Sequence, residues 1–100
     1  MAERCEIRLT VIGTKGDVLR FQYSRWEKSL QARYTEPIEW PPRRFVCQFE
    51  TIGCDLNQLQ SLSRRWPRLV FLLDYEIRRR RVKGIVKAKA GELEHHLVRY

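Results

Sequence analysis

The stretch FLLDYEIRRRRVKGIVKAK, residues 71–89, decides the fold of this chain. Apolar and polar residues alternate on both sides of four consecutive arginines, a pattern that predicts two antiparallel strands joined by a turn. With a four-residue loop from Arg78 to Arg81, every pair on one side is apolar or glycine: Ile77 with Val82, Tyr75 with Gly84, Leu73 with Val86, and Phe71 with Ala88. A shift of one residue would turn this apolar set toward solvent, so the register is strongly specified.

The hairpin is expected to continue into a third strand near residues 93–99. A tight turn at Ala90 and Gly91 would return the chain beside the second strand. The polar side then carries opposite charges in register: Glu76 with Lys83, Glu94 with Lys87, and Glu92 with Lys89. We therefore predict a C-terminal three-stranded meander.

The upstream sequence predicts two further strands and two helices. Residues 5–12 and 44–52 alternate as half-buried strands do, and apolar residues at helical spacing indicate helices over about 15–33 and 55–66. Thr14, with Asp17 three residues later, and Asp55 suit the helix starts. The Pro-rich stretch TEPIEWPPRR allows an irregular connection or a very short edge strand at residues 38–40. These elements predict a single ferredoxin-like α+β domain over residues 1–100, an antiparallel sheet with two helices on one face.

Three segments carry a resemblance to a known family: EIRLTVIG (6–13), FETIG (49–53) and LSRRWPRLVFLLDYE (62–76), with Gly84 shortly after. Together they are similar to the YubB-type ferredoxin-like domain of small plasmid and phage proteins of unknown function. The resemblance implies the fold and an origin in a mobile element. It brings no catalytic or ligand residues. The chain departs from longer members in its short Pro-rich connection.

Composition indicates a folded cytoplasmic protein. The chain is 43% hydrophobic and 32% charged, and its longest apolar run, residues 69–73, is too short to cross a membrane. The first residues lack the apolar stretch of a signal peptide. Three cysteines at irregular spacing, Cys5, Cys47 and Cys54, fit a reducing compartment better than a disulfide framework.

The net charge of +8 falls within residues 64–89, while the rest of the chain sums to zero. Along the predicted strand, two arginine groups stand about 25 to 30 Å apart. One is Arg78, Arg79, Arg80 and Arg81, and the other is Arg64, Arg65 and Arg68. The leading hypothesis is a non-enzymatic module that binds DNA or RNA phosphates through both groups. The simpler interpretation is a solvated hairpin tip and helix-end cations.

A second functional hypothesis is a protein-interaction module, with an exposed sheet edge or Trp40 contacting an acidic partner protein. The simpler interpretation of Trp40 is that it closes the edge of the core. The other large aromatic residues fall at predicted core positions, so no base-stacking motif is visible. His96 beside the arginines could serve a small ribonuclease, and Cys54 near a helix start could be a reactive thiol. No nucleophile–base pair, metal-ligand spacing or cofactor motif appears, so we expect no enzyme, metal or cofactor. The oligomeric state stays open.

Overall fold

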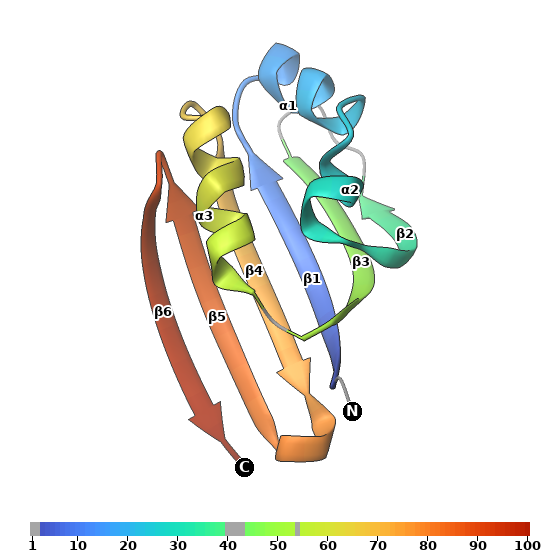
Figure 1. Cartoon of the computed structure of the whole chain (residues 1–100). Coiled ribbons are helices and arrows are strands. Elements are labelled where there is room, and N and C mark those ends of the chain that lie inside the picture. Colours follow the sequence, from blue (N-terminus) through green and yellow to red (C-terminus); the bar gives the residue numbers. More distant parts are fainter. Residues whose placement is uncertain (1–2, 40–43, 54) are drawn as a thin grey trace.

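The computed structural model describes residues 3–39, 44–53 and 55–100, which form one six-stranded sheet with helices packed on it (Figure 1). In chain order the elements are β1 (Arg4–Ile12), α1 (Lys15–Gln22), α2 (Trp26–Leu30), β2 (Arg33–Glu39), β3 (Arg44–Ile52), α3 (Leu56–Arg65), β4 (Val70–Ile77), the 3₁₀ turn η1 (Arg78–Arg80), β5 (Val82–Lys89) and β6 (Glu92–Arg99). The strand order is β2-β3-β1-β4-β5-β6, and every neighbouring pair is antiparallel. The predicted α+β class and antiparallel sheet are thus confirmed.

The predicted C-terminal meander is also confirmed, including its register. Ile77 pairs with Val82, and Tyr75 with Gly84, across β4 and β5. The turn at residues 90 and 91 sets Lys89 against Glu92 across β5 and β6. The apolar alternation was sufficient here because only one register keeps all of these side chains out of water.

The core lies between one face of the sheet and the three helices. In β1 the odd-numbered residues 5–11 are buried, whereas the even-numbered residues point to the opposite, open face. The ring of Phe21, at the end of α1, lies 5.3 Å from Phe71 of β4 and 5.4 Å from Trp66, which follows α3. Full burial of such a side chain contributes roughly 1.5–3 kcal/mol, so these rings hold the helices on the sheet.

The prediction of a single helix over residues 15–33 is wrong: α1 ends at Gln22, α2 begins at Trp26, and the described residues form three α-helices rather than two. Phe21 and Trp26 are both buried, and their stacked rings lie 5.8 Å apart. Residues five apart point about 140° away from each other on one continuous helix, so both could not face the sheet. The break solves this conflict. Ser24 closes the turn, since its backbone N and its hydroxyl both donate to the carbonyl of Phe21.

The predicted short edge strand exists but lies earlier and is longer than expected. β2 pairs with β3 through two register shifts, which indicate bulges or irregular pairing. Pro37 is accommodated because β2 is at the sheet edge, where a strand needs hydrogen bonds on one side only.

Glycine at position 84 makes room for an aromatic ring. A Cβ atom there would stand 2.2 Å from Cε1 and Cζ of Tyr75. The Tyr75 ring therefore lies across β5 over Gly84, and its hydroxyl reaches Nε2 of His95 on β6 at 2.6 Å. This contact ties the three strands of the meander together.

Candidate functional site

The four arginines form the end of the β4–β5 hairpin, as predicted. Arg78–Arg80 make the 3₁₀ turn η1, and Arg81 closes it in the left-handed conformation, with φ of 53°. Its backbone N donates to the carbonyl of Arg78 at 3.1 Å. All four side chains are exposed, so this segment, which we call the arginine turn (residues 78–81), projects into solvent.

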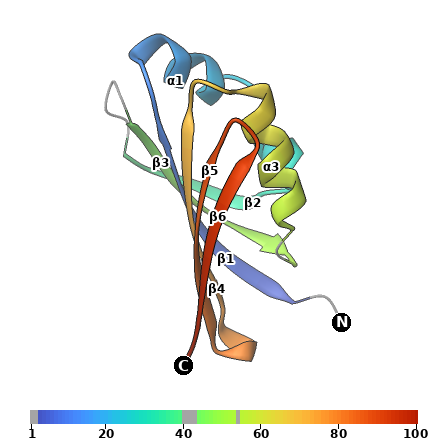
Figure 2. The same cartoon turned by 90° about the vertical axis from the view of Figure 1, so that its left-hand side faces the viewer.

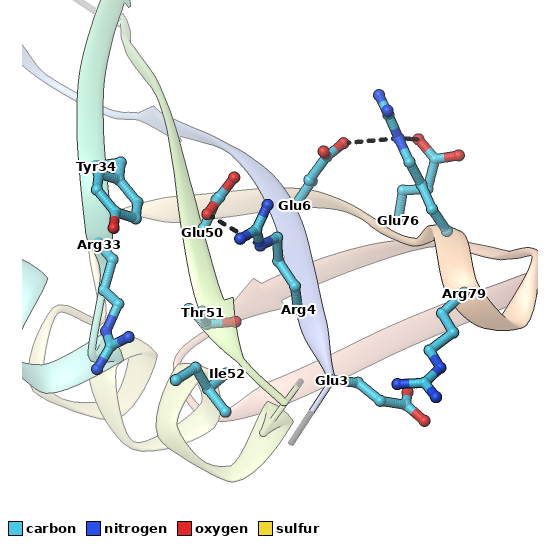
Figure 3. A pocket seen from close by; sticks show the side chains of 11 residues that line it. Glu3, Arg4, Glu6, Arg33, Tyr34, Glu50, Thr51, Ile52, Glu76 and Arg79 are labelled. Atoms are coloured by element: carbon cyan, nitrogen blue, oxygen red, sulfur yellow. Dashed lines mark ion pairs between the residues drawn. The ribbon is translucent and has the colours of Figure 1, made fainter. Parts of the chain in front are cut away.

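Three carboxylates lie beside the arginine turn and engage two of its members. Nε of Arg78 lies 3.2 Å from Oε2 of Glu6 and 3.8 Å from Oε1 of Glu76 (Figure 3). Nε of Arg80 donates to Oε1 of Glu3 at 2.6 Å. Counting charge along the sequence placed Glu3 and Glu6 in the neutral part of the chain. Folding brings them to the turn because β1 lies next to β4.

Arg79 and Arg81 form no ion pair within the described part of the chain. Both are exposed, and Arg79 extends from the turn toward the side where Glu3 lies (Figure 3). These two guanidinium groups can approach a phosphate without first breaking an ion pair.

An exposed aromatic residue stands next to the turn, and the sequence analysis missed it. Tyr100 is 52% exposed; its backbone N donates to the carbonyl of Arg81 at 2.9 Å, and its hydroxyl donates to Glu76. This hydrogen bond to a carboxylate raises the pKa of the Tyr100 hydroxyl above its ordinary value. Nζ of Lys83 lies 5.3 Å from the ring centroid, within range of a cation–π interaction. The confirmed register, extended by one pair, already puts residue 100 opposite residue 81, and this was the signal that could have found it.

The second arginine group lies at the other end of the sheet, near the end of α3 (Figure 1). Its members are engaged within the chain: Arg65 donates to the hydroxyl of Ser29 at 2.9 Å, and the Arg64 side chain covers Gly91. Arg68 helps to lower the pKa of Asp17, although hydrogen bonds from Thr14 and Arg20 are the larger causes. The two groups do not form one surface.

Between the turn and β2, the open face of the sheet is hollowed into two adjoining grooves of about 560 and 740 Å³. Both are lined by Glu6, Tyr34, Glu50, Glu76 and Arg78. Figure 3 shows this side of the sheet, with Tyr34 at one border and the arginine turn at the other. Acidic and basic groups alternate here, so the grooves do not form a uniformly positive channel.

Three glutamates cross the open face in a row. Glu50, Glu6 and Glu76 lie directly opposite one another on β3, β1 and β4. Like charges in such positions repel, and arginines relieve the repulsion: Arg4 lies 3.5 Å from Glu50, and Arg78 contacts the other two. Two arginines thus offset part of the charge of three glutamates, and the row keeps a net negative charge. Within the described ranges, no group of three or more His, Cys, Asp or Glu side chains could hold a metal ion.

The remaining candidates are dispersed. Trp40 and Cys54 lie outside the described residues. His95 and His96 point to opposite faces of β6, and both are exposed. His95 lies on the helix side, where its Nε2 bonds the Tyr75 hydroxyl at the edge of the core. Among the described residues, no helix is long and apolar enough to cross a membrane.

Comparison with protein-family models finds no match, and neither the curated proteins nor the solved structures yield one. The resemblance to the YubB-type domain therefore stays a prediction.

Proposed function

We propose that this protein is a non-enzymatic module that binds single-stranded nucleic acid, RNA or DNA, at the arginine turn. The observation that carries the proposal is the half-exposed ring of Tyr100, held beside Arg81 and Lys83, with Arg79 on the same turn. Proteins that bind single strands combine cations for the phosphates with aromatic rings on which bases stack. Tyr100 supplies the ring and the three cations supply the phosphate contacts.

The surroundings favour a single strand at the turn over a strand laid across the middle of the sheet. RNA-binding sheets of the RRM type stack bases on aromatic residues of their central strands. On the open face of β1 and β3 the side chains are those of residues 4, 6, 8, 10, 12, 44, 46, 48, 50 and 52, and none is aromatic. The glutamate row would also repel a phosphate backbone. We therefore expect contact at the end of the sheet where Tyr100 lies; Tyr34 of β2, the exposed aromatic residue at the far border of the grooves, is separated from the turn by the glutamate row.

We also propose that β1 to β4, with their helices, are a ferredoxin-like unit and that β5 and β6 extend it. The strand order β4-β1-β3-β2, all antiparallel, with helices between β1 and β2 and between β3 and β4, supports this proposal. The first connection departs from the simple pattern, since it carries two short helices in place of one.

The test is binding of a fluorescent 20-nucleotide single strand, measured by anisotropy at 50 and 200 mM salt. Three phosphate contacts on a single strand give a slope of about −2 in log affinity against log salt, hence a loss of roughly 20-fold over this range. The double variant Arg79→Ala/Arg81→Ala keeps one of the three contacts, so its affinity should fall only about threefold between 50 and 200 mM salt. The matched control, Arg64→Ala/Arg65→Ala, removes the same charge at the other end of the sheet and should keep the wild-type slope.

The stacking contact is tested separately. Tyr100→Ala should weaken binding by about 1–3 kcal/mol, that is, fivefold to over a hundredfold. Tyr100→Phe keeps the ring and should retain most of the affinity. If the two arginine double variants lost the same amount of salt dependence, or if the protein bound no single strand, this site would be excluded. A protein partner that survives nuclease treatment in a pull-down would instead favour the interaction-module hypothesis, in which the arginines attract an acidic protein.

A further inference from the structure

β6 forms one edge of the sheet, and its charged residues are Glu92, Glu94 and Arg99. It pairs with β5 over eight consecutive residue pairs without a register shift, and it contains neither proline nor lysine. The opposite edge strand, β2, carries Pro37 and two register shifts. Natural sheets use proline, lysine or bulges to keep edges from pairing with other chains. Figures 1 and 2 show β6 lying along the outside of the sheet.

The backbone of β6 offers hydrogen-bonding groups to a further strand. The amide of Tyr100 donates toward β5, to the carbonyl of Arg81 at 2.9 Å. Because the direction alternates along an antiparallel strand, the amides and carbonyls of residues 93, 95, 97 and 99 point away from β5. The side chains of these residues lie on the helix side of the sheet, and those of residues 92–98 with even numbers lie on the open side.

We propose that β6 pairs antiparallel with β6 of a second copy of this chain, around a two-fold axis at His95. The axis runs perpendicular to the sheet, so the pairing joins two six-stranded sheets edge to edge and keeps all helices on one side. The inference rests on the strand edge and is independent of the proposed nucleic-acid binding.

The side chains select this register among its neighbours. In the register centred on His95, Leu93 of each copy faces Leu97 of the other copy on the helix side. Glu94 faces His96 of the other copy on the open side. These apolar and hydrogen-bonding pairs occur twice by symmetry. The outermost pair on the open side is Glu92 with Val98. A register centred on residue 94 would oppose two carboxylates, one centred on residue 96 would separate the leucines and set Leu93 against Arg99, and one centred on residue 97 would oppose histidine and arginine.

The contacts of His95 leave the axis clear. Its Nε2 lies 2.6 Å from the Tyr75 hydroxyl, so the ring leans toward its own β4 and away from the edge. Leu97, 49% exposed, would be covered by Leu93 of the second copy. A strand-to-strand interface of this kind is small, so we expect a weak dimer that depends on concentration.

Sedimentation velocity over about 10 to 500 µM protein tests the dimer. The wild-type chain should move from the monomer mass toward twice that mass. Leu97→Lys, which places a charge in the apolar pair, should weaken association at least tenfold. The matched control is Ile85→Lys, which removes a side chain of similar exposure (57%) from the open face of β5, away from the edge, and should associate as the wild type does. Far-ultraviolet circular dichroism checks that both variants fold.

Cross-linking tests the register. In a Cys54→Ser background, His95→Cys places two thiols across the axis with Cα atoms about 5.5 Å apart, within disulfide range. His96→Cys places its two Cα atoms about 8 Å apart, beyond that range. Mild oxidation should therefore give a covalent dimer with His95→Cys and none with His96→Cys. A covalent dimer from His96→Cys alone, a monomer at every concentration, or unchanged association of Leu97→Lys would overturn the proposal.

Discussion

At the scale of single residues, the contact between Tyr75 and Gly84 yields a stability prediction. Gly84→Ala places a methyl group 2.2 Å from the ring, whose hydroxyl is held by His95, so the ring must shift. We expect a loss of about 1–3 kcal/mol in the free energy of unfolding, measured by urea titration. The control is Gly16→Ala in α1, where nothing lies within 4 Å of the added atom and a gain of up to about 1 kcal/mol is expected. Equal stability of wild type and Gly84→Ala would contradict the close contact.

Buried side chains could be predicted from the sequence more reliably than contacts between charges. Tyr75 and Gly84 could be paired from the apolar alternation alone, because a shifted register would expose every apolar neighbour. The pairing of Arg80 with Glu3 could not be predicted, since those residues meet only when β1 lies beside β4. Tyr100 was missed although the predicted register, extended by one pair, places it opposite Arg81.

At the scale of elements, the strands with strict alternation were predicted well, and the segment between β1 and β3 was not. The helical spacing over residues 15–33 predicts one helix, but the segment forms two short ones. Tyr23 fits the apolar stripe of the predicted helix and is in fact 81% exposed. The break depends on Phe21 and Trp26 both reaching the sheet, which is a tertiary requirement. β2 extended beyond the predicted residues because pairing with β3 overrides weak local propensity.

The start of α1 makes stability depend on pH. The Thr14 hydroxyl donates to the Asp17 carboxylate, and Arg20 pairs with it; together they lower the pKa of Asp17 below 3.8, with the Thr14 bond the larger cause. A lowered pKa in the folded state adds stability above the ordinary pKa, and this is lost as pH falls through the lowered value. Wild type should therefore exceed Asp17→Asn in urea midpoint at pH 7, and the difference should shrink at about pH 2.5. A difference that does not change with pH would argue against a charged Asp17 as its source.

At the scale of the whole molecule, the order of the strands decides both charge and burial. Counted along the sequence, the whole net charge of +8 falls in one half of the chain. In the fold, β1 brings Glu6 to the arginine turn, and Glu3, just before β1, pairs with Arg80 there. The same central position of β1 buries Cys5 and, through its neighbour β3, Cys47 in one core. Composition suggested reduced cysteines, and both of these side chains are buried. Their environment could only be assigned once the strands were in order.

Alkylation of these two thiols should report unfolding of the whole domain. Burial, with a smaller effect from the charge of Glu27, raises the pKa of Cys47 to about 12, so at pH 8 about one thiol in 10⁴ would be ionised even if reagent could enter. Cys5 and Cys47 lie in the same core, so both should react only when that core opens. In iodoacetamide pulses analysed by peptide mass spectrometry, we expect equal, slow rates at both positions that rise together with urea. Rapid alkylation of Cys47 in the native protein, at the rate of a free thiol, would show that β3 opens separately from β1.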